Sequence, residues 1–119
     1  MTSDLSAATS YHASTVDAPD YEPFIVGDTA IGEVHWIRRG GAGGTTLAVG
    51  LWRSGPQDFP YPFATDETIH VLEGVLDIKL ASGELVTLRA GDVASFVKGT
   101  SSHWTVREPF RKLFIVSDA

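Results

Sequence analysis

Apolar and polar residues alternate along most of this chain with the two-residue period of β-strands. The clearest run is 45–53, where Leu47, Val49 and Leu51 share one face and Trp52 lies on the other. Similar short runs predict further strands at 24–26, 34–37, 67–72, 75–80, 85–89, 93–97, 103–106 and 111–116. No window shows the 3.6-residue period of an amphipathic helix. We therefore predict an all-β fold, an antiparallel double-sheet jelly-roll barrel of about nine or ten strands.

The first twenty residues lack this alternation. Residues 1–20 are rich in Ser, Thr, Ala and Asp, which predicts a mobile acidic N-terminal arm ahead of a single barrel domain over 21–119. Within the domain, segment 54–64 carries three prolines and is expected to be loop or edge strand. The glycine-rich segment 40–44 predicts a hairpin turn, because it lacks the Lys-Ser/Thr ending and the helix of a phosphate-binding loop.

Composition and charge narrow the functional classes. The chain has no cysteine, which excludes disulfides and thiolate metal sites. With no signal-peptide pattern and no apolar run of membrane-spanning length, we expect a cytoplasmic protein. Residues 1–37 hold six acidic and no basic residues, whereas 38–119 hold nine of each. This distribution argues against nucleic acid or an anionic membrane as a partner.

A set of short motifs lies between residues 45 and 116. The motifs are Trp52, Asp66-Glu67, Val71-Leu-Glu-Gly74, Gly91-Asp92, Gly99, Trp104 and Arg111-Lys112. The set resembles the cupin superfamily, and more closely the small single-domain cupins related to EutQ and to (S)-ureidoglycine aminohydrolase. The resemblance implies an RmlC-like jelly roll. It assigns no reaction, because a shared fold does not determine function.

The resemblance also implies where a metal would be expected, since cupin motifs normally supply three histidines and one glutamate. Glu67 matches the glutamate. Other residues occupy the histidine positions: Pro60 and Pro62 or, with a shorter spacer, Tyr61 and Phe63 in the first motif, and Ser102 in the second. His103 is one residue past the last position and should point outward unless a bulge turns it back. We therefore expect neither a metal of the usual cupin type nor another cofactor.

Glu67 is the leading candidate for chemistry. Alternation places it on the same face as Ile69 and Val71, so its carboxylate should be buried and needs a partner or a raised pKa. We predict a catalytic acid/base or a ligand anchor; the alternative is a structural carboxylate paired with Lys, Arg or Tyr. The candidate ligand-binding residues are aromatic or basic: Trp52, Tyr61, Phe63, His103, Trp104, Arg111 and Lys112. For the aromatic residues, the alternative is packing in the core. Arg111 and Lys112 are neighbours on one strand, so one of them should face inward.

Three functions stay open from the sequence. The first is a metal-free cupin-fold protein that binds a small polar metabolite in the barrel mouth. The second is an enzyme resembling the (S)-ureidoglycine aminohydrolases, with Glu67 as acid/base on a small amide or ureido metabolite. The third is a non-catalytic homodimer, joined through outward apolar residues such as Leu72 or through the arm around 24–26. We expect a small-molecule ligand and a second copy of the chain as partners.

Overall fold

The computed structural model describes residues 10–17 and 20–117, which form ten strands and one 3-10 turn, η1 (Ala42–Gly44). The strands are β1 (Glu22–Val26), β2 (Thr29–Arg39), β3 (Leu47–Ser54), β4 (Gln57–Pro60), β5 (Asp66–Glu73), β6 (Val75–Leu80), β7 (Leu85–Arg89), β8 (Val93–Phe96), β9 (Ser102–Val106) and β10 (Phe110–Ser117). Among these residues no helix is long and apolar enough to cross a membrane.

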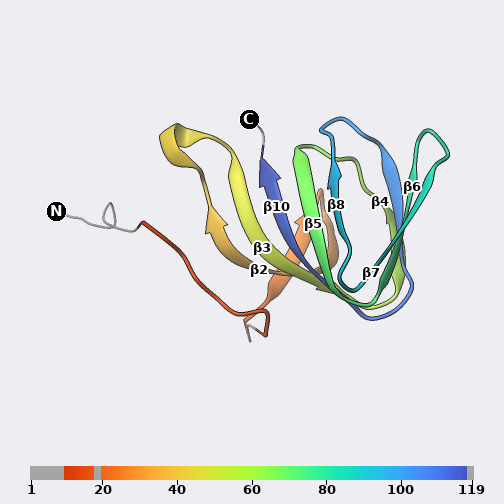
Figure 1. The fold of residues 1–119 in the computed structure, drawn as a ribbon, viewed down its shortest axis with the longest axis horizontal. Coiled ribbons are helices and arrows are strands. Elements are labelled where there is room, and N and C mark those ends of the chain that lie inside the picture. Colours follow the sequence, from red (N-terminus) through yellow and green to blue (C-terminus); the bar gives the residue numbers. More distant parts are fainter. Residues whose placement is uncertain (1–9, 18–19, 118–119) are drawn as a thin grey trace.

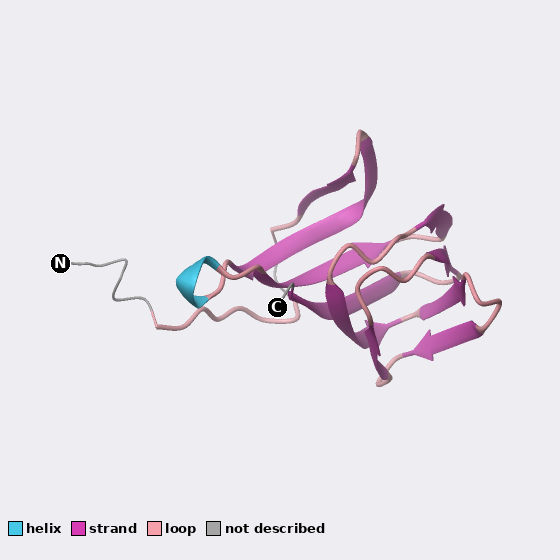
Figure 2. Cartoon of the chain, turned by 90° about the horizontal axis from the view of Figure 1, so that it is seen from above, coloured by secondary structure: helices cyan, strands magenta, loops and turns pink. Residues whose placement is uncertain are grey.

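The strands form two antiparallel sheets that face each other, which confirms the predicted all-β double-sheet fold (Figure 1). One sheet has the order β1-β2-β3-β10-β5-β8 and the other has the order β4-β9-β6-β7. Figure 2 shows the same layers from above. No pairing between the described strands joins one sheet to the other, so the predicted barrel is open along its sides.

One strand is longer than predicted, and another lies in the segment predicted to be loop or edge strand. β2 is much longer than the predicted 34–37, and it contains Gly32 at φ +65°, close to the point where its pairing with β1 shifts register. This irregularity breaks the alternation that would have revealed the longer strand. β4 lies in the proline-rich segment and pairs only with β9 at a sheet edge, as expected of a segment that contains prolines.

The core lies between the sheets and follows the alternation. Ile69 on β5 and Ile78 on β6 are fully buried, one from each sheet. On β3, Trp52 faces inward opposite Lys112, whereas Leu51 is paired with Leu113 on the other face. The two faces predicted for the 45–53 run are therefore confirmed.

Two glycines let large side chains pack against the backbone of the six-stranded sheet. A Cβ atom on Gly50 would lie 2.9 Å from the Phe114 ring, and one on Gly32 would lie 2.8 Å from the Trp52 indole. Both distances are shorter than ordinary carbon–carbon contact. A larger residue at either position would displace an inward-facing aromatic ring.

Part of the N-terminal arm contacts the outer face of the six-stranded sheet. Ser14 Oγ is 2.8 Å from Nε2 of His35 on β2, and Arg111 on β10 donates a hydrogen bond to the Val16 carbonyl. These contacts tie Ser14 and Val16 to two strands. The remaining parts of the predicted arm, 1–9 and 18–19, lie outside the described residues.

Candidate functional site

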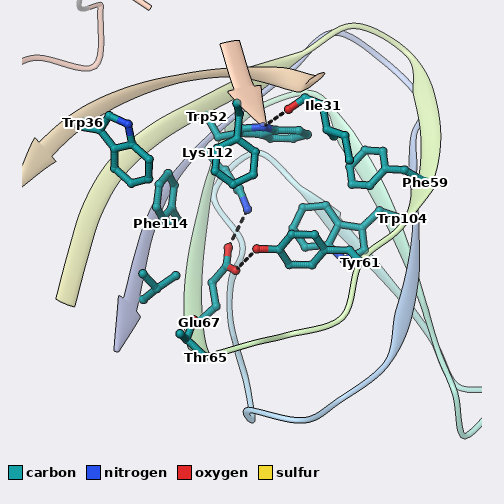
Figure 3. Close-up of a pocket in the computed structure, with 12 residues that line it drawn as sticks. Ile31, Trp36, Trp52, Phe59, Tyr61, Thr65, Glu67, Trp104, Lys112 and Phe114 are labelled. Atoms are coloured by element: carbon teal, nitrogen blue, oxygen red, sulfur yellow. Dashed lines mark hydrogen bonds and ion pairs between the residues drawn. The ribbon is translucent and has the colours of Figure 1, made fainter. Parts of the chain in front are cut away.

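A cavity of about 190 Å³ lies between the two sheets. Its wall is mainly aromatic, and the aromatic side chains that line it are Phe24, Trp36, Trp52, Phe59, Tyr61, Trp104 and Phe114. All three tryptophans of the chain are therefore on this wall. The polar side chains that line it are Tyr61, Thr65, Glu67 and Lys112 (Figure 3). Because an apolar cavity of about 150 Å³ can hold benzene, this one has room for a compact ring-sized molecule.

Three polar side chains meet on the cavity wall through direct hydrogen bonds. Lys112 Nζ donates to Glu67 Oε2 at 2.7 Å, and the Tyr61 hydroxyl donates to Glu67 Oε1 at 2.8 Å (Figure 3). The Lys112 and Glu67 side chains are only 4% and 2% exposed. Both oxygens of this buried carboxylate therefore have a donor, as a desolvated carboxylate requires.

The register of the sheet brings these groups together. Glu67 pairs with Val116 near one end of the β5–β10 ladder, and Lys112 pairs with Val71 towards the other end. Both side chains point inward, and the long lysine side chain spans the distance between the two positions along the strands. Tyr61 reaches the same carboxylate from the loop that follows β4.

Aromatic rings surround the Lys112 ammonium group. Nζ lies 4.3 Å from the centroid of the Trp104 ring, 5.2 Å from that of Trp52 and 5.4 Å from that of Phe114. These distances fall within the range of cation–π attraction, which strengthens where water is excluded. The rings therefore hold the ammonium group in place while keeping water from it.

Burial changes the proton affinity of two groups in this cluster. It lowers the pKa of the Lys112 amine, and the neighbouring Glu67 carboxylate only partly offsets the effect. Burial and the same carboxylate raise the pKa of the Tyr61 hydroxyl, so this hydroxyl stays protonated and remains a donor. The tyrosine therefore keeps its proton, whereas the lysine holds its proton less tightly than an exposed lysine does.

Five of the residues singled out from the sequence meet at the cavity: Trp52, Tyr61, Glu67, Trp104 and Lys112. The other three lie elsewhere. Arg111 points to the outer face, where it donates to Glu73 at 2.8 Å. His103 is half exposed and lies 3.5 Å from Asp58, pointing outward as its place in the motif indicates. Phe63 is buried behind the cavity wall, where it stacks on Phe96 at 4.6 Å.

Several lining residues were not among those predicted from the sequence. Phe114 and Val116 share the inward face of β10 with Lys112, so the two-residue period was a signal that could have found them. Trp36 and Phe24 come from β2 and β1, where an irregular register hides the alternation. Phe59 and Thr65 lie in or beside the proline-rich segment, whose pattern gave no orientation.

The residues around Glu67 do not suit a metal of the cupin type. The chain within 10–17 and 20–117 contains no cluster of three or more His, Asp or Glu side chains. Both Glu67 oxygens already accept hydrogen bonds, one of them from a cation. Ser102, at the last histidine position, accepts a hydrogen bond from the Trp104 indole and donates one to the Tyr61 carbonyl. A divalent ion would have to displace the Lys112 ammonium group and would find one carboxylate and no imidazole.

Comparison with known protein families assigns the chain to one of them. The family model for the EutQ-like cupin domain matches residues 41–114. The chain belongs to the EutQ-like cupin domain family. The resemblance seen in the motifs is thus confirmed, together with the jelly-roll architecture that it implied.

Solved cupin structures share the fold. A DUF861 family protein from Thermotoga maritima is 31% identical, with 54% of this chain and 73% of that chain covered and a TM-score of 0.53. A candidate ethanolamine utilisation protein Q from Salmonella typhimurium is 22% identical over 85% and 96% of the two chains, with a TM-score of 0.65. KdgF from Halomonas sp. is 17% identical, with 92% of this chain and 95% of that chain covered and a TM-score of 0.67. The last two likenesses concern the fold alone. No curated protein matches the chain.

Proposed function

We propose that this cupin binds a small, neutral and largely apolar molecule in the cavity, with one polar group of the ligand directed at Lys112. The observation that carries the proposal is the desolvated Lys112–Glu67 pair on the wall of a mainly aromatic cavity. A buried ion pair rarely stabilises a fold more than apolar side chains of similar volume would. Its position on a cavity wall therefore supports a role in binding.

The lining favours a particular ligand chemistry. The sequence suggested a polar metabolite, but most of the wall is aromatic carbon, which suits an apolar body. The charges of Lys112 and Glu67 balance, so a charged ligand would lose its hydration without a free counter-charge. An ammonium group has three donors, and one of them is used by Glu67. The ligand group that fits beside it is an acceptor oxygen, such as that of a hydroxyl or carbonyl.

The test uses two neighbouring positions on β10 that face opposite sides of the sheet. Val116 lines the cavity, whereas Ile115 is 41% exposed on the outer face. Val116→Phe should fill the cavity, and Ile115→Phe adds the same ring outside it. We would measure the thermal shift of both variants and of the wild-type protein with benzyl alcohol and with benzamide.

We expect both compounds to raise the melting temperature of the wild-type protein and of Ile115→Phe, with dissociation constants of about 1 mM or tighter for ligands of this size. The shift should be lost in Val116→Phe. Equal shifts in the two variants would contradict binding in this cavity, as would the absence of any shift in the wild-type protein.

Two other functions drawn from the sequence stay predictions. An enzyme with Glu67 as acid/base would need this carboxylate to accept a substrate proton. The carboxylate would first have to give up one of the hydrogen bonds that it accepts from Tyr61 and Lys112. For the homodimer, β10 and β8 expose Ile115 and Val93 at 41% and 65% on the outer face. Measuring the mass of the native particle by light scattering tests the homodimer, and a monomer would contradict it.

A further inference from the structure

We propose that Lys112 captures a small aldehyde or ketone as an imine, so that the ligand of this cavity is a carbonyl compound held by a reversible covalent bond. This inference rests on the proposed function, because it names the chemical class of the ligand that the cavity binds. Lysine amines that attack carbonyl groups are found where burial favours the free amine, and a neighbouring base can take up the proton that the amine releases. The geometry around Lys112 provides both conditions.

The first condition is a desolvated amine that a ligand can reach. Lys112 Nζ lies on the cavity wall with its side chain 4% exposed, surrounded by the rings of Trp52, Trp104 and Phe114. Among the described residues that line the cavity, Lys112 alone carries a positive charge. A carbonyl compound with an apolar body would place its polar carbon–oxygen bond at this group. Burial also lowers the pKa of this amine, which favours its unprotonated, nucleophilic form.

The second condition is a proton acceptor at hydrogen-bond distance. Glu67 Oε2 is 2.7 Å from Nζ, and the Tyr61 hydroxyl fixes the other carboxylate oxygen. Among the lining residues the titratable groups are these three alone: Tyr61, Glu67 and Lys112. The proton that leaves the ammonium group therefore has one acceptor in the cavity, and that acceptor can return it.

The reaction balances without an oxidant, a reductant or a metal. Lys112 passes one proton to Glu67, and the freed lone pair forms a carbon–nitrogen bond to the carbonyl carbon while the carbonyl π pair moves to oxygen. That oxygen takes up a second proton from nitrogen to give the carbinolamine. Glu67 then returns its proton to this hydroxyl, the carbon–oxygen bond breaks and water leaves. Two of the three ammonium protons depart in that water, and the third stays on the iminium nitrogen.

The product keeps the charge that the site already accommodates. The iminium group carries the single positive charge that the ammonium group had, and Glu67 is again a carboxylate beside it. The rings that attract the ammonium group attract an iminium cation in the same way. The cavity is therefore complementary both to the starting amine and to the product.

The experiment is reductive trapping on the wild-type protein, so it does not depend on a variant that folds. The chain has three lysines, and Lys79 and Lys98 are exposed. Protein is treated with benzaldehyde and sodium cyanoborohydride, which at neutral pH reduces an iminium ion to a stable secondary amine and largely spares the free aldehyde, and the label at each lysine is measured by peptide mass spectrometry. The same reaction is run with excess benzyl alcohol, which is similar in shape but forms no imine.

We expect Lys112 to carry about tenfold more label than Lys79 or Lys98, because the cavity holds the aldehyde beside the amine. Benzyl alcohol should suppress the label at Lys112 alone. Val116→Phe should lose the Lys112 label, and Ile115→Phe should keep it. Equal labelling of the three lysines, unaffected by benzyl alcohol, would overturn the inference.

The thermal shift distinguishes this inference from the proposed function. If benzyl alcohol raises the melting temperature through the cavity and Lys112 takes no label from benzaldehyde, the imine is ruled out and the binding function stands. If benzyl alcohol gives no shift and Lys112 takes no label, both proposals fail.

Discussion

Two adjacent residues on β10 form ion pairs with β5, one on each side of the sheet. Arg111 Nε donates to Glu73 at 2.8 Å, and Lys112 Nζ donates to Glu67 at 2.7 Å. The nitrogen–oxygen distances of the two pairs are nearly equal, but the solvent exposure of their side chains differs. The outer side chains are 27% and 53% exposed, whereas the inner ones are 4% and 2% exposed. The same chemistry thus occurs in water on one face and without water on the other.

The comparison shows how solvent determines what an ion pair can do. Water screens the outer pair, and a pair of this kind contributes about 0–1 kcal/mol. The inner pair is desolvated, so the complete pair contributes only modestly to the free energy of unfolding. If one partner is removed, the other becomes a buried charge without a counter-charge, which is strongly destabilising. Apolar side chains of similar volume would stabilise the fold about as well as such a pair does. The inner pair is therefore best explained by what the cavity binds.

The largest effect should come from breaking the inner pair on one side only. Lys112→Met leaves Glu67 buried without its cation, and we expect the free energy of unfolding to fall by about 3–5 kcal/mol. Denaturation with urea at pH 7 measures this. Adding Glu67→Gln in the same chain removes the uncompensated charge, so the double variant should recover much of the loss. A double variant as unstable as Lys112→Met would show that lost packing, and not charge, sets the effect.

An intermediate effect should come from removing the other donor to Glu67. Tyr61→Phe deletes a hydrogen bond to a charged group, and we expect a loss of about 1.5–3 kcal/mol at neutral pH. The pKa of Tyr61 is raised in the fold, so its stabilisation is complete below the ordinary tyrosine pKa of 10.0 and is lost as the pH rises above it. The gap in unfolding free energy between wild-type protein and Tyr61→Phe should therefore narrow above pH 10.

Tyr11 supplies the matched control for this pH dependence. It is 77% exposed, so Tyr11→Phe should change stability little at any pH. A gap for Tyr61→Phe that stays constant up to pH 11, or that behaves like the gap for Tyr11→Phe, would contradict the buried hydrogen bond.

A smaller effect is expected for the outer pair. Arg111→Met removes the exposed contacts with Glu73, Asp17 and the Val16 carbonyl, and we expect a loss of less than about 1 kcal/mol, reduced further by added salt. Urea denaturation at low and high salt measures both properties. A loss as large as that of Lys112→Met would remove the contrast between the two faces.

The smallest effect is expected at His103. Its side chain is half exposed and 3.5 Å from Asp58, away from the cavity. His103→Ala should change the free energy of unfolding by no more than about 0.5 kcal/mol and should leave the thermal shift with benzyl alcohol unchanged. Loss of the ligand-induced shift in this variant would mean that the site extends beyond the cavity.

Much of the fold could be predicted because burial on one face imposes a period of two. The faces of the 45–53 run and the inward direction of Glu67 follow from this rule, and both agree with the structure. The rule fails where the register shifts. β2 carries Gly32 in a left-handed conformation beside such a shift, and only part of this strand was recognised.

The choice between Arg111 and Lys112 could not be made from the sequence for a related reason. Both faces of β10 carry apolar side chains, with Phe114 inward and Ile115 outward, so hydrophobicity does not assign the faces. A register shift against β5 also lies between the two basic residues. The ion pair that defines the site therefore depends on tertiary pairing, which a pattern along one strand does not contain.

The central claim is that the cavity beside the inner ion pair binds a ligand, and tryptophan fluorescence tests it most directly. All three tryptophans, Trp36, Trp52 and Trp104, line the cavity, so their emission reports its occupancy without an added label. Titration with benzyl alcohol should give a saturable change in the wild-type protein and in Arg111→Met, and none in Val116→Phe. A wild-type emission that does not change, or a change that is the same in Val116→Phe, would contradict the claim.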